Sequence, residues 1–395
     1  MATSLADQLQ RLNVLETSVL RDNKRPSLLF NPKEAATLSK ETVYQIGLEG
    51  LEELIQKNEV FSQFKHTLFH EKSKSFERSV QTTEINEKLN KSLRRMLLSM
   101  SPYFLFNCSH KVLEWLICIF SIHDLRDDLL MLCLPYHEST MFVRVLQLVK
   151  FEDKNDSFYF FKQSLLNHAA SDIGFLKYVT LYLKDLLKVH SKHELLSVAI
   201  NFFCIVFTGT LEYLDNIGED LLCQMLPLII KGLNSTTADF YAASLVVTVR
   251  LVTKTTLSDH LIDKLVEKIS EFSVSNLKKE ASLVLKIIYQ SQEHYKNIPS
   301  TAIKNILTIQ ELPKILDNLQ SNGNSIYPFL KRLISCFTHE GVNNDEKLSR
   351  DVMKACLDLI KVKNTFVFTI LRCILDAVNT KLQISPEAQN WLIEI

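Results

Sequence analysis

The chain has 395 residues, of which 46% are hydrophobic and 23% charged, so it can bury a large interior and is not disordered as a whole. Lys and Arg number 45, as do Asp and Glu, and this zero net charge excludes a binder that needs a global excess of positive charge to hold nucleic acid. Only 8 residues are Gly and 9 are Pro. Because tight hairpins and phosphate loops need glycine, this composition favours helices joined by short polar corners.

Apolar residues recur with helical period along most of the chain. In residues 42–57, one stripe contains Val43, Ile46, Leu51, Leu54 and Ile55, and Ser39 is expected to cap that helix. No convincing strand alternation occurs. Further helices are predicted near 84–99, 109–122, 137–149, 172–190, 194–211, 215–232, 237–255, 259–272, 276–291, 301–310, 311–320, 326–337, 347–361, 365–380 and 386–395.

Two internal similarities indicate a repeat of helix pairs. The tetrapeptide ASLV at 243–246 recurs at 281–284, an offset of 38 residues (281 − 243), which also aligns Leu265 with Ile303. Together with the pattern described next, this offset is typical of the HEAT and armadillo period of ~40–47 residues.

A second pattern, Leu-Pro-x-Ile followed by another aliphatic residue, begins at Leu226 and again at Leu312, an offset of 86 residues (312 − 226) or two units of 43. Pro227 and Pro313 are expected in the first turn of the inner helix, where a missing N–H costs little. A two-helix unit cannot bury its own apolar face, so neighbours must stack. The sequence therefore predicts an all-α fold, an α-solenoid of HEAT-like antiparallel helix pairs.

Residues 195–211 form an apolar stretch that could be taken for a membrane-spanning helix. Residues 195–211 carry no charged side chain. A spanning helix needs ~20 predominantly apolar residues, and this stretch is shorter and contains polar side chains. A helix buried on all sides has the same pattern, so burial is favoured and no membrane segment is predicted.

Histidines do not predict a metal site. His66 and His70 have the i, i+4 spacing of a zinc-protease pair, but Thr67 stands where that motif needs glutamate, and no third ligand has zinc-like spacing. His190 and His193 lie at a predicted helix end, where capping is the favoured interpretation.

Cysteines do not predict catalysis either. Cys133 and His137 could form a thiol–imidazole pair, but Cys133 lies in a Leu-rich run that favours a buried, inert thiol. No C-x-x-C pair occurs, and the eight cysteines are interpreted as small buried hydrophobic residues in a reducing compartment. They are Cys108, Cys118, Cys133, Cys204, Cys223, Cys336, Cys356 and Cys373.

Two kinds of side-chain cluster, basic and aromatic, could contact nucleic acid. Lys88, Lys91, Arg94 and Arg95 form a basic cluster, for which a solvated helix face is favoured over an RNA contact. The aromatic runs at 158–161 and 202–203 are not interleaved with Lys or Arg, so core packing is favoured over base stacking. No glycine-rich phosphate loop occurs. No catalytic, cofactor-binding or metal-binding residue is assigned, no cofactor is expected, and the chain is predicted not to be an enzyme.

A string of short sequence motifs gives a more specific indication than composition, helical period or side-chain clusters. It comprises SLLFNPKEAA at 27–36, GLEEL at 50–54, FERSVQT at 76–82, SPYFL at 101–105, LEWLI at 113–117, LPYHE at 134–138, FVRV at 142–145, DIGF at 172–175, KGL at 231–233 and DFYAA at 239–243. Together these motifs resemble the start of the family of nucleolar HEAT repeat-containing protein 1, called small-nucleolar-RNA-associated protein 10 in yeast. The resemblance covers residues 1 to about 250 well and the rest more weakly.

This resemblance implies a family-specific helical region at 1–150, continuous with HEAT-like repeats at 151–395, in which a conserved family domain covers about 215–330. It implies a scaffold in nucleolar ribosome biogenesis, in small-subunit processome assembly and pre-rRNA processing, that supports RNA polymerase I transcription. The implied partners are processome proteins, among them β-propeller proteins of the subcomplex that binds pre-rRNA. Contact with pre-rRNA or snoRNA is expected to be indirect, and no small-molecule substrate is expected.

The architecture alone permits another function, that of a HEAT-type transport adaptor or regulatory scaffold in the cytoplasm. The family resemblance favours the nucleus and nucleolus. Family members are several times longer than this chain, which ends at Ile395 within a helical pattern. We therefore expect it to be an N-terminal fragment or the product of a truncated gene model.

Overall fold

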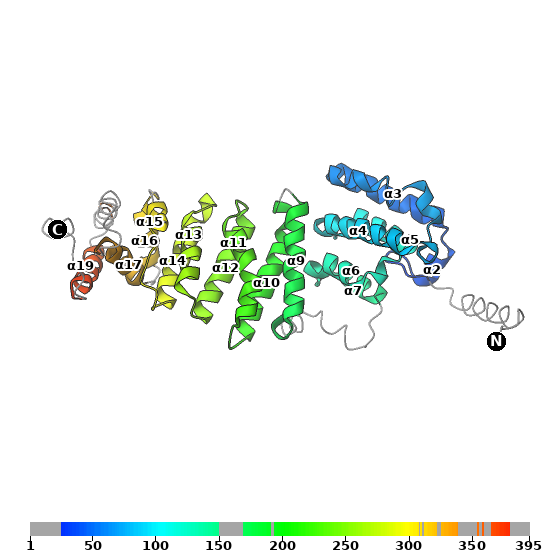
Figure 1. Cartoon of the computed structure of the whole chain (residues 1–395). Helices are drawn as coiled ribbons and strands as arrows, with labels where there is room; N and C mark the ends of the chain where they lie inside the picture. Colours follow the sequence, from blue (N-terminus) through cyan, green and yellow to red (C-terminus); the bar gives the residue numbers. More distant parts are fainter. Residues whose placement is uncertain are drawn as a thin grey trace, which may run out of the picture. The chain divides into compact units, whose positions relative to one another are not determined.

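The computed structural model describes residues 25–149, 169–190, 193–307, 309, 312–321, 325–338, 354, 358 and 365–379. Over these residues all regular structure is helical and no strand occurs (Figure 1), as predicted. The chain divides into two compact units. The first comprises Met1–Leu165 and Leu181–Ala199, and the second comprises Leu166–Thr180 and Ile200–Ile395. The domain boundary expected near residue 150 stays a prediction.

The first unit is built from short and medium helices around one apolar interior. Its helices are α2 (Pro32–Thr37), α3 (Lys40–Lys57), α4 (Thr83–Met100), α5 (Asn107–Phe120), α6 (Arg126–Cys133) and α7 (Thr140–Leu148). Short 3₁₀ turns connect them, including η1 (Glu59–Phe64), η2 (Glu71–Ser75), η3 (Arg78–Val80) and η4 (Ser101–Tyr103). Helix α9 (Ile173–Val189) has residues in both units.

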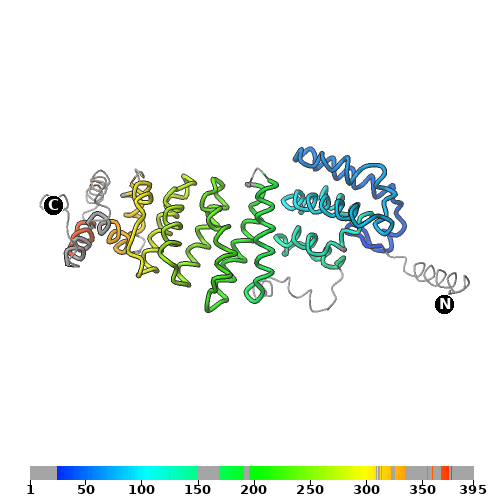
Figure 2. The backbone as a smooth tube through the Cα atoms, in the orientation of Figure 1, coloured from blue at the N-terminus to red at the C-terminus, as the bar shows by residue number. Residues whose placement is uncertain are grey.

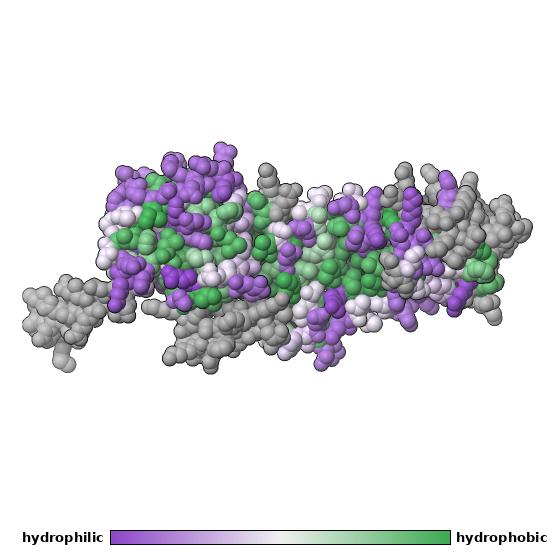
Figure 3. Space-filling view, turned by 180° about the vertical axis from the view of Figure 1, so that it is seen from behind, coloured by the Kyte–Doolittle hydropathy of each residue, from purple (hydrophilic) through white to green (hydrophobic). Residues whose placement is uncertain are grey.

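Helix α3 begins where its sequence predicts. The Ser39 hydroxyl accepts a hydrogen bond from the Thr42 N–H at 3.0 Å, which satisfies one of the free donors of the first turn. Val43, Leu51 and Leu54 of the predicted stripe are buried, whereas Ile46 and Ile55 are half-buried. The opposite face carries exposed polar residues such as Glu49, and hydrophilic side chains cover this helix in Figure 3.

Two glycines bring α3 into close contact with α5. A Cβ atom added at Gly47 would lie 2.5 Å from the Trp115 Cβ, and one added at Gly50 would lie 2.6 Å from the Cys108 carbonyl oxygen. Neither distance leaves room for a methyl group. Glycine is therefore needed in the middle of α3, despite its low helix propensity, because the two backbones approach so closely.

The second unit stacks helix pairs in two layers. The first layer contains α11 (Glu219–Leu233), α13 (Asp259–Ser270) and α15 (Ser300–Leu307); the second contains α12 (Ala238–Lys254), α14 (Lys278–Ser291), α17 (Tyr327–Thr338) and α19 (Thr365–Asn379). Helix α16 (Leu312–Ser321) and most of α10 (Ser197–Tyr213) also belong to this unit. Helices α11 to α14 follow one another as neighbouring coils in Figure 2. This arrangement is the predicted HEAT-like α-solenoid.

The 38-residue similarity corresponds to real structural equivalence. Residues 243–246 lie on α12 and residues 281–284 on α14, which are adjacent helices of the same layer. Leu265 on α13 and Ile303 on α15 are both buried at matching places in the other layer. Each pair therefore covers the apolar face of its neighbour, as a stacked repeat requires.

The 86-residue similarity is not a structural repeat. Pro313 lies in the first turn of α16 as predicted, but Pro227 lies in the interior of α11, so its predicted place was wrong. Proline has no backbone N–H, so the carbonyl of the residue four positions earlier lacks its usual helical hydrogen bond. In α11 this is the carbonyl of Cys223. Pro227 and Cys223 are both exposed, so water can solvate that carbonyl.

Most predicted helices are confirmed to within a few residues. The predicted helix at 137–149 begins only at Thr140, after a 3₁₀ turn. Two observed helices, α2 and α6, were not predicted, because each is too short to show a clear helical period. The predicted helix at 386–395 lies outside the described residues, as does 347–361 apart from Lys354 and Asp358, which are helical.

We predict that Gly50→Ala destabilises the first unit by about 1–3 kcal/mol, because overpacking against a backbone carbonyl outweighs the gain of ~1 kcal/mol in helix propensity. Urea unfolding followed by the fluorescence of buried Trp115, in a Trp391→Phe background, measures the change. Gly218→Ala is the control, because a Cβ there meets nothing within 4 Å. Equal midpoints for Gly50→Ala and the parent would contradict the close α3–α5 contact.

Candidate functional site

The histidine pair considered for metal binding does not lie on a helix. His66 is in a turn after η1, and His70 precedes η2, where its Nδ1 accepts a hydrogen bond from the Lys72 N–H at 3.1 Å. The i, i+4 spacing therefore does not align the two rings as helical geometry would. Within the described ranges, no group of three or more His, Cys, Asp or Glu side chains could hold a metal ion.

The thiol considered for catalysis is buried. Cys133 donates to the Leu129 and Leu130 carbonyls of its own helix, both at 3.3 Å, and burial raises the pKa of this thiol. It is therefore protonated at neutral pH and unsuited to nucleophilic attack. The expectation that the cysteines are buried was wrong for Cys223, which is exposed on α11, and Cys118 and Cys204 are only half-buried.

A buried histidine, His190, follows the last residue of α9. Its ring lies 3.3 Å from the carbonyl oxygen of Leu98 on α4, and both residues belong to the first unit. Phe202 and Phe203 are buried on α10, which confirms core packing for that pair. The aromatic run at 158–161 and the side chain of His193 lie outside the described residues. Among the helices described, none has both the length and the apolar character needed to cross a membrane.

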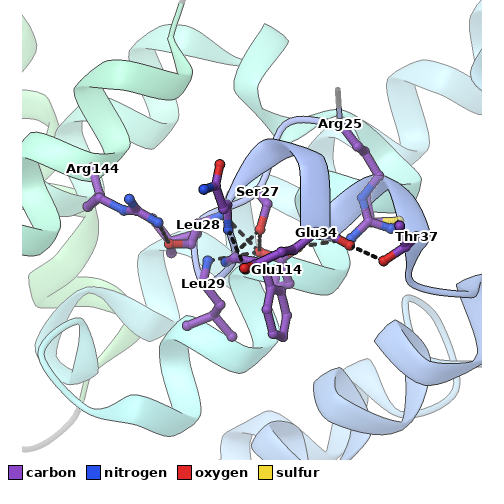
Figure 4. Close-up of polar contacts among 11 residues, drawn as sticks. Arg25, Ser27, Leu28, Leu29, Glu34, Thr37, Glu114 and Arg144 are labelled. Carbon is purple, nitrogen blue, oxygen red and sulfur yellow. Dashed lines mark hydrogen bonds and ion pairs between the residues drawn. The ribbon is translucent and has the colours of Figure 1, made fainter. Parts of the chain in front are cut away.

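The most connected polar group in the first unit is a carboxylate that sequence analysis did not single out. Glu114 lies on α5 and is fully buried. One of its oxygens, Oε2, accepts hydrogen bonds from the Ser27 hydroxyl at 2.9 Å and from the backbone N–H groups of Leu28 at 2.8 Å and Leu29 at 3.1 Å (Figure 4). The other oxygen, Oε1, accepts from the Arg25 guanidinium at 3.3 Å.

These bonds attach the segment before α2 to the core. The Arg144 guanidinium of α7 adds a second link, donating to the Leu28 carbonyl at 3.1 Å. A buried carboxylate is costly unless it is paired and hydrogen-bonded, and Glu114 has both kinds of partner. The arrangement uses both oxygens for protein contacts, so we interpret it as structural and not as a ligand site. The signal for it was a single acidic residue within the apolar run VLEWLI.

Neighbouring Trp115 packs against α3 and the turn that follows η1. Its Nε1 donates to the Leu68 carbonyl at 3.1 Å, and its ring meets the Tyr44 ring edge-on with centroids 5.1 Å apart. The motifs at 27–36, 50–54, 113–117 and 142–145 thus meet around α5. The packing of the first unit therefore explains why these motifs contain the amino acids that they do.

The basic cluster on α4 is exposed, as expected. Arg94 pairs with Asp128 on α6 at 2.7 Å. Lys88 and Lys91 each follow an exposed carboxylate by four residues, Glu84 and Glu87 respectively, so both signs of charge share this face of the helix.

We predict that Glu114→Gln destabilises the first unit by about 1.5–3 kcal/mol, because hydrogen bonds to a charged acceptor are lost in a buried place. Hydrogen exchange measures the local effect: the Leu28 and Leu29 amides should exchange faster. Glu34→Gln is the control, since Glu34 is exposed in the same segment and accepts only a 3.4 Å bond from the Asn31 N–H. Unchanged protection of both amides in Glu114→Gln would show that Glu114 does not hold the segment.

Comparison with known proteins gives consistent matches. A family model described as U3 small nucleolar RNA-associated protein 10 matches residues 221–337. HEAT repeat-containing protein 1 of Homo sapiens is 30% identical over 386 residues, covering 91% of this chain and 18% of the human protein. Its homologue in Drosophila melanogaster is 33% identical over 315 residues, covering 75% of this chain and 15% of that protein.

A fungal relative agrees. U3 small nucleolar RNA-associated protein 10 of Debaryomyces hansenii is 34% identical over 252 residues, covering 58% of this chain and 13% of the fungal protein. The chain thus spans less than one fifth of the length of these relatives. The motif string, the stacked helix pairs and these matches agree, and the chain belongs to the family of HEAT repeat-containing protein 1 and U3 small nucleolar RNA-associated protein 10.

Proposed function

We propose that this chain is a non-enzymatic scaffold in nucleolar ribosome biogenesis. It acts in assembly of the small-subunit processome and in pre-rRNA processing, and it supports RNA polymerase I transcription of rDNA. The proposal rests on the match to HEAT repeat-containing protein 1, which covers 91% of the chain. Fungal relatives in the same family are named for U3 small nucleolar RNA.

The architecture supports a scaffold. Stacked helix pairs place their apolar side chains between layers and expose long polar surfaces, which suit partner proteins better than they suit a small substrate. The titratable residues most suspected of chemistry are buried or dispersed: Cys133 has a raised pKa, and His66 and His70 lie in turns. Catalysis is therefore not part of the proposed function.

The proposed partners are protein subunits of the processome, in particular β-propeller proteins of its pre-rRNA-binding subcomplex. Contact with pre-rRNA or snoRNA is indirect in this proposal, because the zero net charge supplies no global excess of cations for phosphate binding. The proposed location is the nucleolus. The alternative, a cytoplasmic transport adaptor, shares the architecture and differs in location and partners.

We predict that the tagged full chain concentrates in nucleoli and co-purifies processome proteins together with U3 small nucleolar RNA. After crosslinking, the chain purified away from the other proteins should carry no RNA, because RNA is held through those proteins. Retention of crosslinked RNA on the purified chain alone would contradict indirect binding. A steady cytoplasmic signal with transport-cargo partners would favour the alternative function.

A correctly folded control is needed for that experiment. Gly218→Ala should localise as the parent does, because a Cβ there meets nothing within 4 Å. Gly50→Ala, which disturbs the first unit, should lower recovery of processome proteins in proportion to its loss of stability. If the first unit of Gly50→Ala is unfolded and processome proteins are still fully recovered, then the second unit is responsible for binding them.

A further inference from the structure

Helix α19 has apolar side chains on two opposite sides. Phe366 and Ile370, spaced i, i+4, are fully buried, and α17 packs against this helix. Phe368, Leu371 and Leu375 are spaced i, i+3 and i+7, which places them in one stripe on the opposite side. Their exposed fractions are 79%, 37% and 60%. We call these three side chains the outer stripe of α19.

The outer stripe is more than a scatter of single exposed side chains, because its three members share one helical face. Helix α14 of the same layer packs against α12 and against α17, and Val284, Leu285 and Tyr289 among its apolar side chains are buried. A helix inside a stack is apolar over more of its circumference than a helix with one covered side. The outer stripe gives α19 the pattern of a helix with neighbours on two sides, and the described residues leave that stripe uncovered.

The sequence contains a matching apolar pattern shortly after α19. Residues 386–395 lie outside the described residues, and their sequence predicts a helix. Ser385 and Pro386 are residue types that favour a helix start. Most of the positions that follow are polar, but four apolar residues recur at i, i+3, i+4 and i+7, so the predicted helix has one apolar side that needs a cover. These four are Ala388, Trp391, Leu392 and Ile395.

The connection between the two apolar patterns is short. Residues 380–385 separate α19 from the predicted helix, and a connection of about 2–8 residues makes successive helices antiparallel neighbours. The same unit shows this geometry where residues 255–258 join α12 to α13. The Tyr241 hydroxyl, near the start of α12, donates to the Ile269 carbonyl, near the end of α13, at 3.4 Å. A helix at 386–395 is therefore expected to return along α19.

We propose that residues 386–395 dock on the outer stripe of α19. The two stripes have the same length (375 − 368 and 395 − 388, seven residues each), so antiparallel docking sets Ala388 beside Leu375 and Ile395 beside Phe368. A segment of the same chain is favoured over a separate partner, because a short connection gives it a high effective concentration at the stripe. The inference goes beyond the proposed scaffold role and does not depend on it. It removes the outer stripe from the surfaces available to partner proteins.

Tryptophan fluorescence tests the docking in the intact chain. The chain has 2 tryptophans, and Trp115 is fully buried, so acrylamide quenching of the folded protein reports mainly on Trp391. A docked Trp391 should have a Stern–Volmer constant well below that of N-acetyltryptophanamide, which is free in water. The constant should not change with protein concentration, and sedimentation should give the mass of one chain, because the docking is intramolecular.

The variant F368S/L371S/L375S should weaken docking by more than about tenfold, because three apolar side chains no longer gain from burial, and quenching of Trp391 should rise toward the reference. The variant L392S/I395S should have the same effect and leaves α19 itself unchanged, so it answers the question even if the first variant folds poorly. The control I205S/Y213S/V246S removes three exposed apolar side chains elsewhere in the second unit and should leave quenching unchanged.

Three outcomes would overturn the proposal. Quenching of the parent as strong as that of the reference would mean that Trp391 is not docked. Protection that survives F368S/L371S/L375S would place Trp391 on another surface. Protection that disappears on dilution, together with the mass of a dimer, would mean that the outer stripe binds a second copy of the chain. None of these measurements involves nucleolar location or processome proteins, so failure here is separable from failure of the proposed function.

Discussion

Close contact between neighbouring helices is the constraint on which the rest of this molecule depends. A single helix pair has an apolar face that it cannot cover, and only an adjacent pair removes that face from water. Where two backbones approach most closely, a side chain no longer fits. This explains why Gly47 and Gly50 face α5 and why Gly232 faces Ser244 and Phe240, in a chain with few glycines.

The core also contains one charge that organises its surroundings. Glu114 is fully buried, yet both its oxygens have donors from the segment before α2. The interaction is long-range in sequence, since Leu28 and Glu114 are 86 residues apart. A carboxylate in this position is tolerated only with that segment in place, so it couples the start of the described chain to the core of the first unit.

Function in this architecture is a property of surfaces. The stacked pairs leave cations, carboxylates and some apolar side chains on the outside, and the family to which the chain belongs includes relatives named for U3 small nucleolar RNA. On the exposed first half of α4, for example, Glu84 and Glu87 lie one turn before Lys88 and Lys91.

The sequence by itself determined the all-α class, most helix positions, the 38-residue repeat and the family, because helical period and short motifs are local properties. Other features of the structure depend on tertiary packing, because the local sequence pattern carries no information about them. It placed Pro227 inside α11, and it left residues 59–80 in 3₁₀ turns and loops, so that His66 and His70 do not share a helix face. It also buried Glu114 and brought its partners to it, because contacts between residues distant in the chain depend on how helices pack.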